Sequence, residues 1–182
     1  MQRYLIEHCS PTLAGLKTAS LFNLSFSTRE ELDQKVLMAN EMLNEKGLYC
    51  EVMRLRQKSA LIYIYRQHQL EMDLSRFESQ QVLSQVGYRS AEVKLCLELL
   101  KERLCYQENF PHEIGLFLGY PIEDVVGFMT YQGKNCKHTG YWKVYGDVLE
   151  SMRMFSKFKK CKNVYKERFG RGMPIQRLII AD

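Results

Sequence analysis

The sequence predicts an α+β protein in which a small, mostly antiparallel sheet is combined with a large helical insertion. Two apolar runs at residues 48–56 and 59–66 are separated by a two-residue turn, a pattern typical of a β-hairpin. Residues 21–26 (LFNLSF) partly alternate in polarity, which favours a third strand. Between residues 67 and 169 the apolar positions recur at helical spacing instead. A last apolar run at residues 175–180 is expected to form a final strand, and the βαββ…β element order resembles that of a ferredoxin-like sheet. The alternative is that residues 67–169 form a lobe of their own.

The helix expected after the first strand has the clearest boundaries. Thr28 and Glu31 have the spacing of a capping box, and Gly47 stands where a C-terminal cap glycine belongs. Between these caps one helical face is apolar, formed by Leu32, Val36, Ala39 and Leu43.

The insertion is expected to hold several further helices. Residues 67–85 indicate a broken helix, and others are expected to begin at Ser90, Pro111, Pro121 and Asp147 and to end near Cys105, Leu118, Gln132 and Phe169. The glycines among them do not follow a strand in the spacing of a dinucleotide-binding loop, so they are interpreted as positions where helices approach closely: Gly115, Gly119 and Gly127.

Length and composition fit one domain of 182 residues, with a sheet part at about 1–66 and 174–182 and a helical part at about 67–173. No apolar stretch approaches the ~20 residues that a membrane-spanning helix requires, and residues 1–26 lack the pattern of a secretory signal. The six cysteines have no tight spacing, so we expect reduced thiols without disulfides. These observations predict a cytoplasmic protein that does not use a membrane.

Three runs along the chain together resemble a known family signature: FPHEIGLFLGYPIEDVVGF at residues 110–128, CSPTLAGLK at residues 9–17 and GYWKVYGD at residues 140–147. The chain resembles an uncharacterised family of anaerobic bacteria, chiefly clostridia, catalogued as domain of unknown function three-seven-nine-three. The resemblance covers nearly the whole chain and implies a cytoplasmic protein of an anaerobe. It implies no activity.

One hypothesis from the residues is a thiol-dependent enzyme or thiol carrier. Cys9 is the candidate nucleophile, His112 the candidate base, and Lys17 or Asp124 a supporting charge. If a helix begins at Pro111, its dipole lowers the pKa of a histidine in its first turn and suits it to act as a base. The alternative interpretation is that Cys9 is a small buried apolar residue, because most lone cysteines are.

A second hypothesis is a binding module for a planar small molecule or a protein partner. Aromatic rings beside a lysine, as at Trp142, Lys143 and Tyr145, can stack on a flat ligand. The candidate ligand-binding residues are Glu113, Tyr120, Trp142, Lys143 and Tyr145. The alternative is a strand or turn in which Trp142 fills the core, with Glu113 an ordinary acid of a first helical turn.

Metal and nucleic-acid binding receive weaker support. His112 lacks the second histidine of a zinc-protease motif because position 116 is Leu, and Cys136 with His138 forms only half of a paired ligand motif, so we expect no metal site. Residues 151–173 hold eight Lys or Arg and one Glu, a local charge of +7 in a chain of net charge +5. This basic run, with Phe158, Tyr165 and Phe169 interleaved, is the basis of a nucleic-acid hypothesis.

The sequence therefore favours a cytoplasmic ligand- or partner-binding protein, with the thiol enzyme and the nucleic-acid binder as alternatives. It identifies no cofactor, and it does not decide whether the protein is an enzyme.

Overall fold

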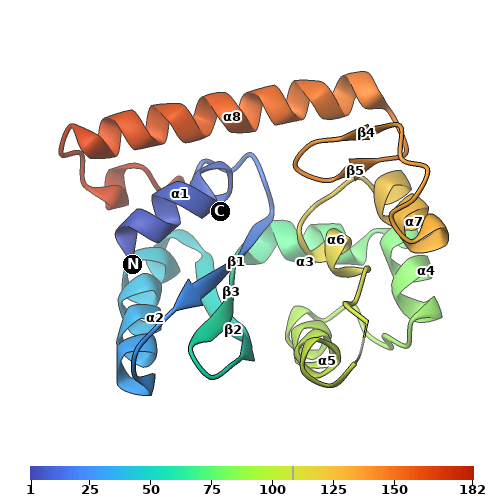
Figure 1. Ribbon diagram of the computed structural model, residues 1–182, viewed down its shortest axis with the longest axis horizontal. Helices are drawn as coiled ribbons and strands as arrows, with labels where there is room; N and C mark the ends of the chain where they lie inside the picture. The colour runs from blue at the N-terminus through green and yellow to red at the C-terminus, as the bar shows by residue number, and fades with distance from the viewer. Residues whose placement is uncertain (108) are drawn as a thin grey trace.

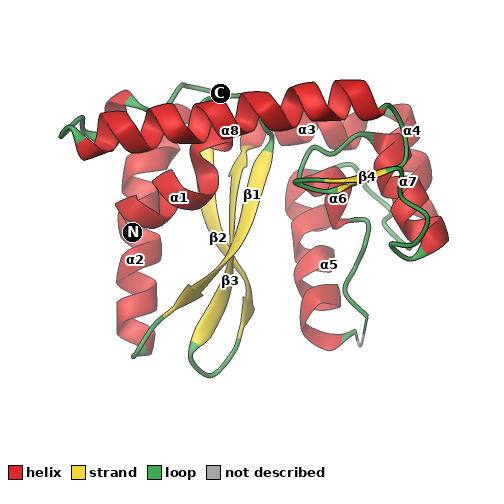
Figure 2. Ribbon diagram, turned by 45° about the horizontal axis from the view of Figure 1, so that its top comes forward, coloured by secondary structure: helices red, strands yellow, loops and turns green. Residues whose placement is uncertain are grey.

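The computed structural model describes residues 1–107 and 109–182, shown as ribbons in Figures 1 and 2. In chain order the elements are α1 (Gln2–Leu13), β1 (Ala19–Ser25), α2 (Arg29–Leu43), a 3₁₀ turn (Asn44–Lys46), β2 (Leu48–Leu55), β3 (Ser59–Arg66), α3 (Gln67–Ser75), α4 (Phe77–Gln85), α5 (Val93–Tyr106), α6 (Ile114–Phe117), α7 (Ile122–Tyr131), β4 (His138–Thr139), β5 (Lys143–Val144), α8 (Val148–Gly170) and a second 3₁₀ turn (Ile175–Arg177). The α+β class predicted from the sequence is confirmed.

The main sheet has three antiparallel strands in the order β1-β3-β2, so β3 is central. Ile62 of β3 faces Phe22 on one neighbouring strand and Val52 on the other, and the register with β2 shifts after Val52. The predicted hairpin at residues 48–66 is confirmed. Two-residue strands β4 and β5 form a separate small hairpin further along the chain.

Strand β3 is buried on both faces, which explains why its sequence, SALIYIYR, is an unbroken apolar run rather than an alternating one. Successive side chains of a strand point to opposite faces. Residues 60, 62 and 64 pack into a core with α1, α2 and α8, whereas residues 61, 63 and 65 pack into a core with α3 to α7. The sheet therefore lies between two groups of helices (Figure 2).

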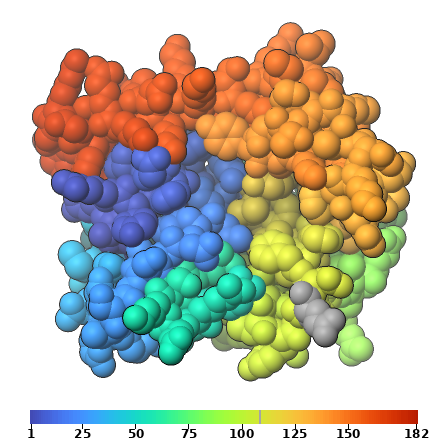
Figure 3. All heavy atoms as spheres, in the orientation of Figure 1, coloured from blue at the N-terminus to red at the C-terminus, as the bar shows by residue number. Residues whose placement is uncertain are grey.

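Helix α8 crosses the molecule and packs on both groups of elements. Near its N-terminus Phe155 and Phe158 pack with Trp142 beside the β4–β5 hairpin. Further along, Cys161 and Tyr165 belong to the core that contains α1. In the space-filling view the orange and red atoms of this segment run along the whole top of the molecule (Figure 3).

The predicted N-terminal caps Thr28 and Asp147 agree with the structure, whereas the helix expected from Ser90 begins at Val93 and Gly47 ends the 3₁₀ turn that follows α2. The backbone N–H of Glu31 donates to Thr28 Oγ1 at 3.2 Å, and that of Glu150 donates to Asp147 Oδ1 at 3.0 Å. Gly47 has a φ of 75°, a left-handed conformation that glycine adopts without steric cost. The predicted break in the helix at residues 67–85 falls at Arg76.

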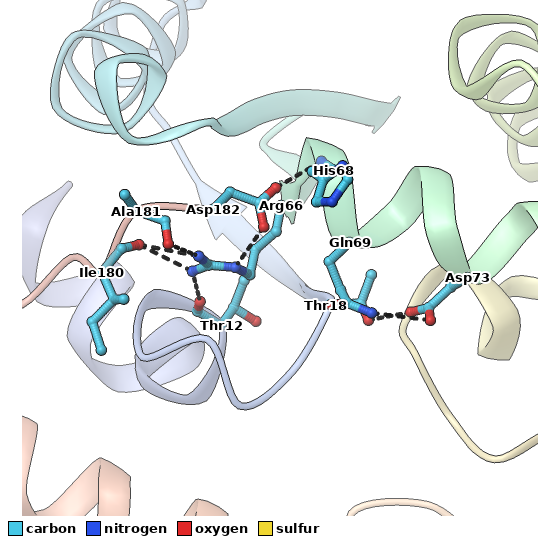
Figure 4. A network of polar contacts seen from close by, with 9 residues as sticks. All are labelled: Thr12, Thr18, Arg66, His68, Gln69, Asp73, Ile180, Ala181 and Asp182. Atoms are coloured by element: carbon cyan, nitrogen blue, oxygen red, sulfur yellow. Dashed lines mark hydrogen bonds and ion pairs between the residues drawn. The ribbon is translucent and has the colours of Figure 1, made fainter.

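The predicted final strand at residues 175–180 is wrong, and so is the ferredoxin-like sheet that it would complete. Residues 175–177 form a 3₁₀ turn. After this turn, the buried Arg66 guanidinium donates to the backbone carbonyls of Ile180 and Ala181 (Figure 4). Arg66 Nε also donates to Asp182 at 3.1 Å. The backbone N–H groups of Ile180 and Asp182 donate to the carbonyls of Leu13 and Lys46, so the tail is held by a side chain and by backbone contacts outside the sheet.

Two helical predictions also need correction. Helix α1 was not predicted, because Pro11 lies inside it and no side chain caps its N-terminus. The helix predicted from Pro111 is the single turn α6, which begins three residues later. In the part of the chain that the structure describes, no helix has the length and apolar character needed to cross a membrane.

Candidate functional site

An apolar cavity of about 380 Å³ lies between α6, α7 and the β4–β5 hairpin. Its walls are mostly aromatic and aliphatic, with a few polar groups among them: Phe110, His112, Ile114, Gly115, Leu118, Tyr120, Asp124, Val125, Phe128, Thr139, Gly140, Tyr141, Trp142 and Lys143. We call it the aromatic cavity. Five of the nine candidate residues predicted from the sequence line it: His112, Tyr120, Asp124, Trp142 and Lys143.

Glycines allow the elements around this cavity to approach closely. A Cβ atom at Gly115 of α6 would lie 2.7 Å from Cγ2 of Val125 in α7. A Cβ at Gly127 would overlap the ring of Tyr145, just after the hairpin. The interpretation of these glycines as positions where helices approach closely is confirmed for Gly115 alone, because Gly127 meets Tyr145 and Gly119 meets Thr18, both outside helices.

Asp124 fixes the hairpin to α7. The side chain is buried, and Oδ1 accepts from the backbone N–H groups of Tyr145 at 2.6 Å and Gly146 at 2.8 Å. Oδ2 accepts from the indole Nε1 of Trp142 at 2.6 Å. Buried carboxylates need such donors, because a buried charge without partners is strongly unfavourable. Asp124 therefore has three of its roughly four acceptor positions occupied by the fold itself.

Trp142 and Tyr120 form a stacked pair in the wall of the aromatic cavity. Their ring centroids are 4.6 Å apart with an interplanar angle of 27°. The Phe155 ring meets Trp142 edge-on at 4.5 Å. The alternative in which Trp142 fills the core is thus partly correct: the indole is 8% exposed and still contributes a flat wall to the cavity.

His112 and Glu113 lie on different sides of the backbone. The His112 ring lines the aromatic cavity and packs edge-on against Phe128 with 4.8 Å between ring centroids. Glu113 points into the core, where its carboxylate forms an ion pair with Arg103 at 2.7 Å and accepts from the Tyr88 hydroxyl at 3.2 Å. Because α6 begins after both residues, the helix-dipole argument for His112 does not apply.

Lys143 and Tyr145 differ in their relation to the cavity. Lys143 lines it, with Nζ 6.0 Å from the Phe128 ring centre and donating to the carbonyl of Gly133 at 2.6 Å. Tyr145 is not among the lining residues: its ring stacks on Tyr131, and its hydroxyl donates to the Lys134 carbonyl.

A second cavity, of about 670 Å³, has polar walls and shares Tyr120 with the first. We call it the polar cavity. It is lined by residues from the loop after α1, by α3 and α4, by the turn between α6 and α7, and by α8: Gly15, Leu16, Lys17, Thr18, Gln69, Asp73, Arg76, Glu78, Ser79, Leu116, Gly119, Tyr120, Pro121, Ile122, Glu123 and Glu150.

Lys17 is the predicted site residue that lies in the polar cavity. Its ammonium Nζ is 5.0 Å from the Tyr120 ring centre. Burial disfavours the charged form and lowers the pKa of Lys17 to about 8. Beside it, Thr18 Oγ1 donates to Asp73 at 2.5 Å, and Gln69 donates to the other Asp73 oxygen at 3.1 Å (Figure 4).

Cys9 lies in the core formed with α2 and α8, and it lines neither cavity. Its side chain is fully buried, and this burial raises the pKa of the Cys9 thiol far above its usual range. A raised thiol pKa opposes nucleophilic chemistry, because the thiolate is the reactive form. The structure does not bring Cys9 and His112 to one cavity.

The sequence reasoning missed several residues that shape the two cavities. Phe110 and Phe128 stand at the two ends of the longest family-like run, and Tyr141 is next to Trp142. Their proximity to the predicted site residues in the sequence could have indicated that they belong to the site. No sequence pattern indicated Asp73, because it lies 55 positions from Thr18 and contacts it only in the folded chain.

The structure also describes the residues on which the metal-binding and nucleic-acid hypotheses depend. Among the described residues, no group of three His, Cys, Asp or Glu side chains is placed to hold a metal ion. In the basic run, Lys162 and Lys166 form ion pairs with Glu7 of α1, while Phe158 and Tyr165 are buried. Buried rings are not accessible for stacking on nucleic-acid bases.

Comparison with known proteins gives one match. A family model described as "Protein of unknown function (DUF3793)" matches residues 5–179. No curated protein and no solved structure matches the chain.

Proposed function

The chain belongs to the DUF3793 family of proteins of unknown function, and from that premise we propose that it is a binding protein whose aromatic cavity holds a small planar molecule. The proposal rests on one observation: rings from three separate segments, at residues 110–112, 120–128 and 141–142, surround a single cavity of about 380 Å³. Sites for small molecules usually have this size, apolar walls and a few placed polar groups.

The stacked pair of Tyr120 and Trp142 supports a planar ligand. Aromatic rings bind one another in offset stacks or edge-on, with contributions of about 0.5–1.5 kcal/mol beyond the area that they bury. Phe128 adds a third ring to the walls. A flat ligand can contact several of these rings together, whereas a branched aliphatic molecule of equal volume cannot.

Lys143 supports an acceptor group on the ligand. An ammonium has three donors, and Lys143 uses one of them on the Gly133 carbonyl. Lys143 thus has two donors left, whereas the buried Asp124 carboxylate has about one acceptor position left, because three N–H groups already donate to it. A planar aromatic acid therefore fits the polar groups of the cavity better than a planar amine does.

The experiment uses Trp142, which is the only tryptophan of the chain. The probes are naphthalene-2-carboxylate and its neutral counterpart naphthalene-2-carboxamide, titrated while Trp142 emission is recorded. We expect saturable quenching by both probes and tighter binding of the carboxylate. The absence of saturable quenching by either probe would contradict the proposal.

Matched variants locate the binding. Phe128→Ala removes a cavity wall, and Phe77→Ala removes an exposed ring of α4 that lies outside the cavity. We expect Phe128→Ala to weaken binding of naphthalene-2-carboxylate by roughly tenfold, about 1.4 kcal/mol, and Phe77→Ala to leave it unchanged. Equal losses in both variants would place the probe elsewhere. Lys143→Met should remove the preference for the carboxylate over the carboxamide.

We also propose that the protein works in the cytoplasm. All six cysteines are free thiols, and four of them are buried. Free thiols are typical of reducing compartments. Fractionation of cells that produce the protein tests this, and recovery of the chain outside the cytoplasm would contradict it.

A further inference from the structure

The polar cavity holds an amine that the proposed ligand site does not use. Lys17 lines it and makes no hydrogen bond or ion pair with any residue that the structure describes. Lysines without such partners are ordinary where water solvates them, as at the exposed Lys58, but Lys17 is partly buried in the cavity wall. A partly buried ammonium without a hydrogen-bond acceptor is unfavourable, so this position favours the neutral amine.

The fold holds Lys17 in place through its neighbour Thr18. The Thr18 hydroxyl donates to Asp73 of α3 (Figure 4). On its other side Thr18 packs against Gly119, where a Cβ atom would overlap the Thr18 hydroxyl. Gly119 has a φ of 69°, a left-handed backbone conformation that is strained for residues with a side chain. The loop that carries Lys17 is therefore fixed between α3 and the α6–α7 turn.

The walls around Lys17 suit a neutral, hydroxylated molecule. The ionisable groups that face the cavity are Asp73 and Arg76 at the end of α3, Glu78 of α4, Tyr120, Glu123 of α7 and Glu150 of α8, while Cys9 of α1 approaches Lys17 from the core. Four carboxylates outnumber the Lys17 amine and one guanidinium, which disfavours an anionic ligand. Carboxylates accept hydrogen bonds from hydroxyl groups.

We propose that the polar cavity binds a small hydroxylated aldehyde or ketone and that Lys17 forms an imine with its carbonyl carbon. The Nζ lone pair of the neutral amine forms the new C–N bond, and the carbonyl oxygen takes a proton to give a carbinolamine. That oxygen then leaves as water with a second proton, while the nitrogen forms the C=N bond. Both protons come from the amine, and the carboxyl groups of the wall can carry them. One water is released per imine, with no oxidant or reductant.

The experiment traps the imine on the intact chain. The folded protein is incubated with glycolaldehyde and sodium cyanoborohydride at pH 7.5, and the alkylated lysines are mapped by peptide mass spectrometry. We expect the adduct to accumulate on Lys17 at least tenfold faster than on Lys58, an exposed lysine in the β2–β3 turn. Both rates come from one sample, so the comparison needs no variant.

Two further measurements identify the cause of fast labelling. The ratio of the rates at Lys17 and Lys58 should be highest below pH 8 and fall as the pH rises from 8 towards 10.5, because burial makes Lys17 neutral at a lower pH than an exposed amine. Acetaldehyde, which lacks the hydroxyl group, should label Lys17 with a much smaller ratio. Equal labelling of Lys17 and Lys58 by glycolaldehyde at pH 7.5 would overturn the proposal. Trp142 quenching is not used, so failure here is distinguishable from failure of the proposed ligand site.

Discussion

The indole N–H of Trp142 donates to Oδ2 of Asp124 across 2.6 Å, and both side chains are buried. This contact joins the β4–β5 hairpin to α7 and sets one wall of the aromatic cavity. The two residues are 18 positions apart in the chain, so the bond exists only once the hairpin has folded back.

Asp124→Asn should destabilise the protein by about 2–3 kcal/mol. An amide keeps one acceptor oxygen and presents an NH₂ group to one of three N–H donors, which leaves buried donors unpaired. Urea unfolding measures the loss, and a red shift of Trp142 emission should accompany it. Glu123→Gln makes the same chemical change at an exposed neighbour and should stay within about 0.5 kcal/mol of the wild type. Similar losses in both variants would show that the three hydrogen bonds contribute little.

Two glycine substitutions should change stability in opposite directions. A Cβ at Gly140 overlaps the Phe155 ring, so Gly140→Ala should cost about 1–3 kcal/mol through displaced packing. Gly170 ends α8, and a Cβ added there would have open space within 4 Å, so Gly170→Ala should stabilise by about 0.5–1 kcal/mol through helix propensity. Thermal unfolding compares them. A stable Gly140→Ala variant would mean that Phe155 moves without cost and that the Trp142 wall tolerates the shift.

Lys17→Met should stabilise the protein at neutral pH and lose this advantage in alkali. The pKa of Lys17 is lowered from its ordinary value of 10.5 to about 8 in the folded chain, so between these values the unfolded state binds more protons. Stability of the wild type therefore rises with pH in this window, and below pH 8 the full cost of burying the charge is present. We expect Lys17→Met to be more stable by about 1–3 kcal/mol at pH 6.5, with a smaller difference at pH 9.5. Urea unfolding at both pH values measures it, with Lys58→Met as control. A difference that does not change with pH would exclude the shifted amine.

Iodoacetamide should distinguish the cysteines of the native protein. Cys105 is exposed and should be alkylated first, whereas the buried Cys9, whose thiol pKa is raised, should react only after unfolding. Mass mapping of timed samples gives the order. Alkylation of native Cys9 as fast as that of Cys105 would restore the thiol-dependent hypothesis.

The local part of the fold was predictable because its causes are local. Thr28, Gly47 and Asp147 mark helix ends by their own side chains or backbone, and the β2–β3 hairpin follows from two apolar runs and a short turn. The tail was not predictable in this way. Residues 175–180 have the composition of a strand, but the partners at the end of this run are distant in sequence: Arg66 donates to the Ile180 carbonyl, and the Ile180 N–H donates to Leu13.

The same distinction applies to the candidate site. The aromatic residues near Trp142 were found from their clustering in sequence, and they do line one cavity. Adjacent residues can point in opposite directions, which is why His112 reaches the cavity and Glu113 pairs with Arg103 in the core. The surroundings of Lys17 come from α3, α4, α7 and α8, so only the folded chain shows that this amine faces a polar cavity.

Tyr120 belongs to the walls of both cavities, and its burial raises the pKa of its hydroxyl to about 12. The torsion angles of this one side chain therefore affect the space in both cavities. Any molecule that turns this ring from one side alters the space on the other side. By thermodynamic linkage the two occupants must then change each other's affinity by the same factor, whether they cooperate or compete.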